Sequence, residues 1–300
     1  MMKLKHYSLA LLSVTLFSCG NSSSSPDAGT GEKDHKDAPT ASAKPKAPAA
    51  EGARRVLFIG NSHTDYYVSL PKMFSEVCTF NKQDMKVDEL VEMGISLKEI
   101  YNQDKTKADA MFANKDNDGN YYDYVVIQEK TPVALQGLEE YKTSVKMLAD
   151  KVHANSPGAV ILVYEVMSPV DYQESASDFK DYYKEMHNNA KAVVSNTPNA
   201  TLYQLGSAVR DAYTGAHGYE YNTGGKDKLR YGQQTLHMLN DAGYLATALL
   251  YTTVFDQKPA MPETLTLSAG TGDSDGQKSM PVSGNISNAQ ALLDIAADNK

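Results

Sequence analysis

Short apolar segments alternate with longer amphipathic ones between residue 53 and about residue 206. Continuous apolar runs of this length are typical of strands buried in a parallel sheet, whereas apolar residues that recur every three to four positions are typical of helices. The pattern predicts strands at residues 55–59, about 85–91, 124–128, 160–165 and 201–205. Because strands and helices alternate, we expect an α/β fold with a central five-stranded parallel sheet between two layers of helices.

Capping residues and prolines mark the expected helix boundaries. Pro71 follows Ser69 at the start of a helix predicted to end near Phe80, and Ser96 is expected to cap a second helix that runs through Ala113. Further helices are predicted at residues 138–154, 178–195, 207–213, 240–255 and 287–297. Segment 214–233 is predicted to be a loop, and segment 257–285, which mixes glycines with acidic residues, is expected to be irregular.

The first 52 residues differ in composition from the rest of the chain. Residues 1–18 combine a basic start with an apolar stretch too short to span a membrane, so they are predicted to be an export signal. Leu16-Phe17-Ser18-Cys19 resembles the lipobox of bacterial lipoproteins, which implies a lipid on Cys19. Residues 19–52 contain little to bury and are predicted to be a disordered tether to one folded domain, residues 53–300. We therefore expect an exported lipoprotein of the cell membrane or outer membrane, facing the periplasm or the exterior.

The composition argues against several function classes. The formal net charge is −8 and the lysines are scattered, so nucleic acid is not expected as a partner. Cys78, the only cysteine besides Cys19, is expected to be a buried free thiol, and neither a disulfide nor a cysteine-rich metal site follows from it. The chain has no tryptophan but 19 tyrosines, so any platform for a sugar ring would have to be tyrosine. We expect no cofactor and no metal.

Small or polar residues follow four of the predicted strands. Ser62, Gly94, Gln128 and Glu165 lie at or just past the strand ends. Since the carboxyl ends of parallel strands meet at one edge of a sheet, where ligands bind, we expect these positions to converge there. Ser62 is the candidate nucleophile because it follows a glycine that ends a buried strand.

A serine hydroxyl needs a neighbouring base to become a nucleophile, and His237 is the best candidate among the seven histidines. It stands before a predicted helix whose start is marked by two good capping residues, Asn240 and Asp241. A loop held by a packed element would present the imidazole well. On spacing alone, a purely structural histidine is an equal alternative.

Four short motifs resemble the ordered blocks of the SGNH, or GDSL-like, hydrolases, over residues 54 to about 255. They are Gly60-Asn61-Ser62, Gly94, Gln128 and His237-Met238-Leu239-Asn240-Asp241-Ala242-Gly243. The similarity is greatest to the branch whose first block reads Gly-Asn-Ser-Phe/His-Thr and whose third block carries a Gln-Glu pair, here Gln128-Glu129. The resemblance implies a three-layer flavodoxin-like fold, a nucleophile at Ser62 and a base at His237. It also implies an oxyanion hole formed by the Ser62 N–H, the Gly94 N–H and the Gln128 side-chain amide.

Most of this superfamily has an asparagine where this chain has Gln128, and a second departure is more serious. The family has an aspartate three residues before the histidine, and this chain has Gln234 there. An amide can orient the imidazole but adds little stabilisation to the imidazolium that forms during attack. Three alternatives stay open: a Ser-His dyad oriented by Gln234 or a backbone oxygen, a binding protein without turnover, or an acid supplied from elsewhere, with the candidates Glu129, Glu165, Asp227 and Asp241.

The resemblance, together with the export signal, implies an esterase of the cell envelope that removes acyl groups from carbohydrate or another small ester, with acetyl as the expected acyl group. The membrane contact would be the lipid on Cys19. The competing hypothesis is a non-catalytic glycan- or peptide-binding lipoprotein on the same scaffold. A flavodoxin- or Rossmann-like cofactor protein would share the strand pattern, but the first strand is not followed by Gly-x-Gly-x-x-Gly.

Overall fold

The computed structural model describes residues 54–117, 119, 121–168, 176–231, 237–270 and 276–300. The predicted export signal, the lipidation site Cys19 and the predicted tether lie outside these residues. Within the described part of the chain, no helix is both long and apolar enough to cross a membrane.

Five parallel strands form the central sheet: β1 (Arg54–Gly60), β2 (Met85–Val91), β3 (Tyr124–Ile127), β4 (Val160–Tyr164) and β5 (Ala200–Tyr203). Their order is β2-β1-β3-β4-β5, and every neighbouring pair is parallel. The predicted five-stranded parallel sheet and its flavodoxin-like topology are therefore confirmed. Strand β1 lies inside the sheet and is buried from Val56 to Ile59, which explains its unbroken apolar run.

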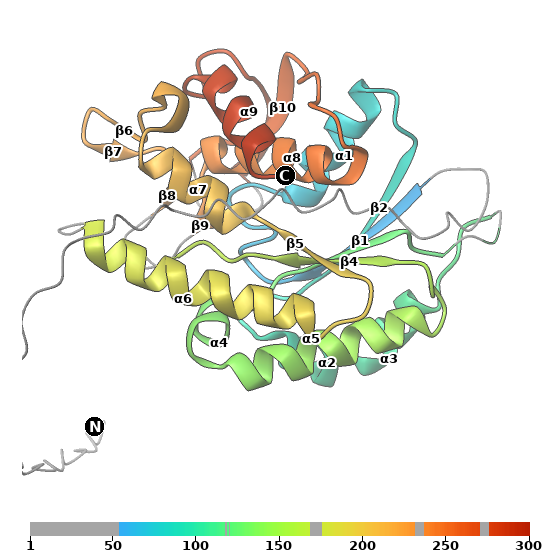
Figure 1. Cartoon of the computed structure of the whole chain (residues 1–300). Helices are drawn as coiled ribbons and strands as arrows, with labels where there is room; N and C mark the ends of the chain where they lie inside the picture. Colours follow the sequence, from blue (N-terminus) through green and yellow to red (C-terminus); the bar gives the residue numbers. More distant parts are fainter. Residues whose placement is uncertain (1–53, 118, 120, 169–175, 232–236, 271–275) are drawn as a thin grey trace, which may run out of the picture. The chain divides into compact units, whose positions relative to one another are not determined.

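Helices cover both faces of the sheet, as Figure 1 shows. One face carries α1 (Leu70–Phe80), α7 (Leu205–Tyr213), α8 (Asn240–Phe255) and α9 (Ala289–Asp298). The other carries α2 (Leu97–Gln103), α3 (Lys105–Phe112), α4 (Thr131–Gln136), α5 (Leu138–His153) and α6 (Ala176–Ser195). Helix α8 is buried from Asp241 to Val254 and contacts both α1 and α9. The predicted three-layer arrangement is thus confirmed.

The helix predicted from Ser96 to Ala113 is in fact two helices. Ser96 does cap α2, through a capping box with Glu99, but the backbone leaves helical geometry at Asp104, where φ is −132° and ψ is 51°. The Asp104 side chain accepts a hydrogen bond from the Lys107 N–H and so starts α3. Helix α4, which follows β3 and has a proline in its first turn, was not predicted.

Segment 257–285 is not irregular as predicted. It contains β10 (Thr264–Ser268) and β11 (Gln277–Pro281), which pair antiparallel. Leu265 and Leu267 point to the buried side of this pair and alternate with threonines, as expected of a half-buried strand. The alternation spans only five residues beside a glycine-rich stretch, so the sequence signal was weak.

Short elements follow α7, in and just after the segment 214–233 that was predicted to be a loop. They are η1 (Ala216–Gly218), the antiparallel pair β6 (Asn222–Thr223) and β7 (Lys226–Asp227), and the antiparallel pair β8 (Arg230–Tyr231) and β9 (His237–Met238). The last pair leads directly into α8. It therefore decides where His237 lies.

Candidate active site

The loop that carries Ser62 follows β1 and is tightly packed around Gly60. A Cβ atom at Gly60 would lie 2.4 Å from Thr64 Oγ1 and 2.7 Å from Gln128 Oε1, so only glycine fits there. Gln128 Oε1 accepts hydrogen bonds from the Asn61 N–H at 2.8 Å and from the Thr64 hydroxyl at 3.1 Å. The Thr64 N–H donates to the Asn61 carbonyl oxygen at 2.8 Å. We call residues 61–64, which hold the candidate nucleophile Ser62, the nucleophile loop, and these bonds fix it against the end of β3.

The segment that contains Gly94 is tied to the nucleophile loop. Asn61 Nδ2 donates to the Ile95 carbonyl oxygen at 3.0 Å. Gly94 has φ +75°, in the left-handed region that favours glycine. Two residues beyond Ile95, the Leu97 N–H donates to Glu129 Oε1 at 3.1 Å. The Gly94 segment is therefore held on one side by the loop of Ser62 and on the other by the residue that follows Gln128.

A short strand pair and the start of a helix position His237. Strand β9 pairs with β8 so that His237 is opposite Tyr231. The Leu239 N–H donates to the Leu229 carbonyl oxygen at 2.9 Å, and α8 begins at the next residue. As predicted, the histidine directly precedes a packed helix.

Asn240 and Asp241 do not cap α8 as the sequence analysis expected. Asn240 Nδ2 donates to the Ser268 carbonyl oxygen at 3.1 Å, and Asn240 Oδ1 accepts the Ser268 N–H at 2.8 Å. Asp241 Oδ2 accepts the Tyr219 hydroxyl at 2.7 Å, and its Oδ1 accepts the Ser287 N–H at 3.1 Å. The two side chains instead anchor the helix start to β10 and to the segment before α9.

The structure brings the two candidate catalytic side chains together. Ser62 Oγ lies 2.9 Å from His237 Nε2, although the residues are 175 positions apart in the sequence. Burial lowers the pKa of His237, so its imidazole stays neutral to lower pH than an exposed histidine would. A neutral imidazole whose Nε2 faces a serine hydroxyl can take the proton of that hydroxyl during attack.

No protein-family model matches the chain, and no curated protein sequence matches it. Solved structures do match. A DUF4886 family protein from Bacteroides uniformis superposes with a TM-score of 0.58 at 14% identity, over 82% of this chain and 94% of that chain. A candidate SGNH hydrolase from Slackia heliotrinireducens superposes with a TM-score of 0.52 at 22% identity, over 67% of this chain and 99% of that chain. The domain has the SGNH hydrolase fold.

Gln128 is not presented as the oxyanion donor that the SGNH resemblance implies. Its side chain is fully buried, and its Nε2 donates to the Glu129 carbonyl oxygen. Because the Asn61 N–H must face an acceptor, Oε1 of the amide is held toward the nucleophile loop and Nε2 away from it. Gln128 therefore braces the loop. The Ser62 and Gly94 N–H groups stay the candidate oxyanion donors of this site.

Glu129 lies against the start of α2 and not against His237. Its Oε1 accepts the N–H groups of Leu97, at 3.1 Å, and of Lys130, at 2.6 Å. Its Oε2 has no hydrogen-bond partner in the part of the chain that the structure describes. Burial raises the pKa of Glu129 to about 7. The side chain thus supports the Gly94 segment of the candidate site.

The two candidate aspartates are also bonded elsewhere. Asp227 Oδ2 accepts the Tyr213 hydroxyl at 2.7 Å and Arg230 Nε at 3.2 Å, and its Oδ1 accepts the Leu229 N–H at 2.8 Å. Asp241 has the contacts given above. Gln234, which stands where SGNH hydrolases have their acid, lies outside the described residues.

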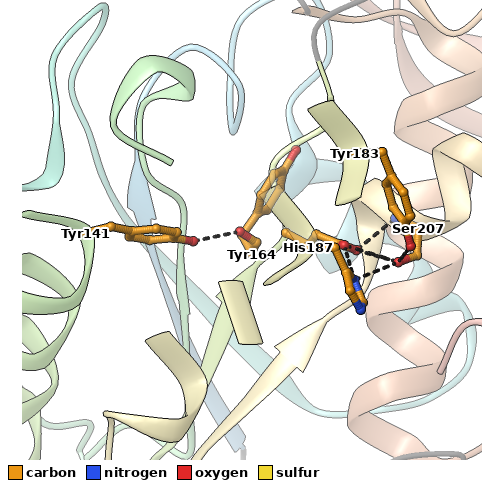
Figure 2. Close-up of polar contacts among 6 residues, drawn as sticks. Tyr141, Tyr164, Tyr183, His187 and Ser207 are labelled. Carbon is orange, nitrogen blue, oxygen red and sulfur yellow. Dashed lines mark hydrogen bonds and ion pairs between the residues drawn. The ribbon is translucent and has the colours of Figure 1, made fainter. Parts of the chain in front are cut away.

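Glu165 belongs to a second serine-histidine cluster, of which Figure 2 labels Tyr183, His187 and Ser207. Its Oε1 lies 2.7 Å from His187 Nδ1, and its Oε2 accepts both the N–H and the hydroxyl of Ser207, each at 2.8 Å. The Tyr183 hydroxyl lies 2.8 Å from Ser207 Oγ. This cluster joins the end of β4 to α6 and α7, and its hydrogen bonds do not reach Ser62.

Aromatic rings around His237 were missed by the sequence analysis. The Tyr66 ring lies 4.6 Å from the imidazole between centroids, at an interplanar angle of 35°. Tyr67 and His63 meet the imidazole edge-on, at 5.7 Å and 5.5 Å. The available signal was position, because these residues directly follow Gly60-Asn61-Ser62. These rings account for part of the burial that lowers the pKa of His237.

Proposed function

We propose that this domain is a serine ester hydrolase, with Ser62 as the nucleophile and His237 as the general base. The observation that carries the proposal is the 2.9 Å contact between Ser62 Oγ and His237 Nε2. Hydrogen-bond reach between nucleophile and base is the basic requirement for activating a serine. The braced loop of Ser62 and the packed helix behind His237 support it further, because both side chains are held by rigid neighbours.

In the proposed reaction, His237 Nε2 takes the Ser62 hydroxyl proton while Oγ attacks the carbonyl carbon of the ester. The Ser62 and Gly94 N–H groups stabilise the negative charge that develops on the carbonyl oxygen. The imidazolium then gives its proton to the leaving alcohol, and an acyl-serine is left. Water attacks this acyl-serine by the same route, which releases the carboxylic acid and restores the dyad.

A dyad is the form of the site that we propose. Each of the four alternative carboxylates is hydrogen-bonded to other groups, so none of them orients His237 in the described part of the chain. A neighbouring carboxylate would raise the pKa of a histidine, whereas that of His237 is lowered by burial. Gln234 or a backbone oxygen is the proposed orienting group.

As substrate we propose an acylated carbohydrate, with acetyl as the acyl group. The support is chemical: tyrosine rings beside the dyad offer a flat apolar face to a sugar ring. As location we propose the cell envelope, through a lipid on Cys19. Mass spectrometry of the mature N-terminal peptide should find an acylated Cys19, and a chain that keeps residues 1–18 would contradict this.

The catalytic proposal is tested by para-nitrophenyl acetate hydrolysis and by labelling with a fluorophosphonate probe. We expect the probe to label Ser62, and Ser62→Ala to lose the label and at least roughly 10³-fold of the rate. Ser195→Ala, which changes an exposed serine on α6, is the matched control. Equal rates for wild type and Ser62→Ala would overturn the proposal. Oligosaccharide binding without any labelling would favour the non-catalytic glycan-binding protein.

A further inference from the structure

Three tyrosine rings form a continuous row that starts at the imidazole of His237. Tyr66 lies 4.6 Å from His237, Tyr67 lies 4.8 Å from Tyr66, and Tyr231 lies 4.6 Å from Tyr67, all between ring centroids. We call Tyr66, Tyr67 and Tyr231 the tyrosine row. Tyr67 is buried, Tyr66 is half-buried and Tyr231 is 51% exposed, so the row leads from the proposed base to the surface.

The exposure of Tyr231 is unusual for this domain. Among the described residues, large apolar side chains of comparable exposure are Phe80, at 51%, and Met93, at 50%. Met93 directly precedes Gly94, and Tyr231 is paired with His237 across β8 and β9. Met93 and Tyr231 thus border the Ser62–His237 site. Phe80 instead lies at the far end of α1, about 15 Å from the end of that helix next to the nucleophile loop. Exposed apolar groups gathered at a reactive site indicate a binding surface.

The row is held in place from both of its ends. Tyr231 lies on a strand whose register is fixed by pairing with His237. At the other end, Gln277 Nε2 donates to the Tyr66 carbonyl oxygen at 3.0 Å and to Asp65 Oδ1 at 2.9 Å. Lys72 Nζ donates to Gln277 Oε1 at 3.1 Å. Polar groups that could meet hydroxyls of a ligand therefore flank the rings.

We propose that the tyrosine row is a subsite for the sugar ring of an acylated carbohydrate, with Tyr231 as its exposed outer face. The proposal rests on the proposed function, because the row matters only if the ester on that sugar reaches Ser62. A pyranose has an apolar C–H face that packs on an aromatic ring and hydroxyls that need polar partners. Tyrosine supplies both a ring face and a hydroxyl, and with no tryptophan in the chain it is the aromatic residue left for this task.

A flat, exposed ring suits a sugar better than a fatty acyl chain. An aliphatic chain gains affinity by being enclosed on several sides, as in an apolar pocket. Tyr231 instead is 51% exposed, and its neighbour Tyr67 meets it at an interplanar angle of 39°. The row therefore selects the alcohol part of the ester, and a small acyl group is left to face Ser62.

The test compares an O-acetylated xylo-oligosaccharide with ethyl acetate, which has no ring to stack. For Tyr231→Ala, the ratio of kcat/KM for the oligosaccharide to that for ethyl acetate should fall roughly 2- to 12-fold, the range of one aromatic packing interaction. Tyr231→Trp should restore the ratio because it restores a ring. Phe80→Ala, equally exposed but away from the site, is the matched control and should leave the ratio unchanged.

A binding measurement separates this proposal from that of the catalytic dyad. By titration calorimetry, the Ser62→Ala protein should bind the oligosaccharide 2- to 12-fold more tightly than the Ser62→Ala, Tyr231→Ala double variant. Equal affinities, or an unchanged kcat/KM ratio in Tyr231→Ala, would overturn the tyrosine row as a sugar subsite while Ser62 labelling still supports the esterase. Tyr231-dependent binding with no labelling of Ser62 would support the row and overturn the esterase.

Discussion

The described part of the chain contains two serine-histidine pairs, Ser207 with His187 and Ser62 with His237. The first pair, together with Glu165 and Tyr183, forms the Ser207 cluster, whereas no carboxylate contacts the second pair among the described residues. In the Ser207 cluster, Glu165 accepts both the hydroxyl and the N–H of the serine. His187 presents one and the same atom, Nδ1, to the glutamate at 2.7 Å and to Ser207 Oγ at 3.5 Å. At the other site, the Ser62 hydroxyl faces the imidazole directly, at 2.9 Å.

The difference between the two pairs lies in where the hydroxyl proton can go. Ser207 donates to a carboxylate and is buried, so its oxygen is neither activated by the histidine nor open to a substrate. Ser62 is partly exposed and has a neutral base in reach. A serine, a histidine and an acid within one cluster therefore do not define an active site. The order of their contacts does.

The largest expected effect comes from exchanging each histidine in turn. His237→Gln should lower kcat for para-nitrophenyl acetate by roughly 10²–10⁴-fold, because it removes the general base. His187→Gln should leave kcat per folded molecule within about twofold of wild type, since the contacts of His187 with described residues are those within the cluster of Glu165, Ser207 and Tyr183. The measurement is steady-state hydrolysis normalised to folded protein. Similar losses in both variants would mean that the two clusters act together.

The reverse contrast is expected in stability. Glu165→Ala leaves the buried Ser207 N–H and His187 without their partner, so the free energy of unfolding should fall by about 2–4 kcal/mol. Ser62→Ala and the exposed control Glu139→Ala should stay within about 0.5 kcal/mol of wild type. Urea denaturation at pH 7 measures this. A stable Glu165→Ala protein that had lost its esterase rate would contradict the structural role of the Ser207 cluster.

A smaller effect is expected from Glu129, the carboxylate behind the Gly94 segment. Its pKa in the folded state, about 7, lies above the ordinary value of a glutamate, so the folded protein binds more protons than the unfolded chain between these values. Its stabilising contribution is therefore complete at low pH and is lost as pH rises through 7, by on the order of 1–3 kcal/mol. Glu129→Gln should flatten this slope in urea denaturation between pH 5 and 8. Parallel curves for the two proteins would refute the assignment.

The smallest effect concerns the pH profile of the proposed Ser62–His237 dyad. Since burial lowers the pKa of His237, the acid limb of kcat/KM should have an apparent pKa below the ordinary histidine value of about 6.5. A carboxylate partner like Glu165 would shift this limb the other way. An apparent pKa above 6.5 for the acid limb of wild type would therefore show that a carboxylate contacts His237, as Glu165 contacts His187.

Much of the fold could be predicted from the sequence because the central strands are buried on both faces. The run from Val56 to Ile59 is entirely apolar, so the position of the strand can be located directly from the sequence. The break at Asp104 could not be predicted with the same ease, because its side chain can either continue a helix or cap the next one. Strand β10 was missed because it lies beside a glycine-rich, acidic stretch typical of a loop, although Leu265 and Leu267 carried its alternation.

In the candidate site, the sequence predicted that Ser62 and His237 meet, but not the hydrogen-bond partners of the residues around them. Ser62 and His237 could be predicted as a pair because their motifs fall at a strand end and a helix start. The direction of the Gln128 amide depends on the Asn61 N–H, 67 residues earlier, and the partner of Glu129 is the Leu97 N–H, 32 residues earlier. Side-chain hydrogen bonds of this kind leave no local pattern, because tertiary packing alone decides them.

The burial of α8 has a consequence for the stage of synthesis at which His237 is fixed in place. His237 precedes a helix that is apolar on all sides and is covered by α1 and α9. Ser62 and α1 are synthesised before α8 and α9, and α9 comes about 230 residues after Ser62. We therefore expect Ser62 to be synthesised long before His237, its proposed base, is fixed. A nascent chain, or one clipped before α9, would carry Ser62 without a fixed His237.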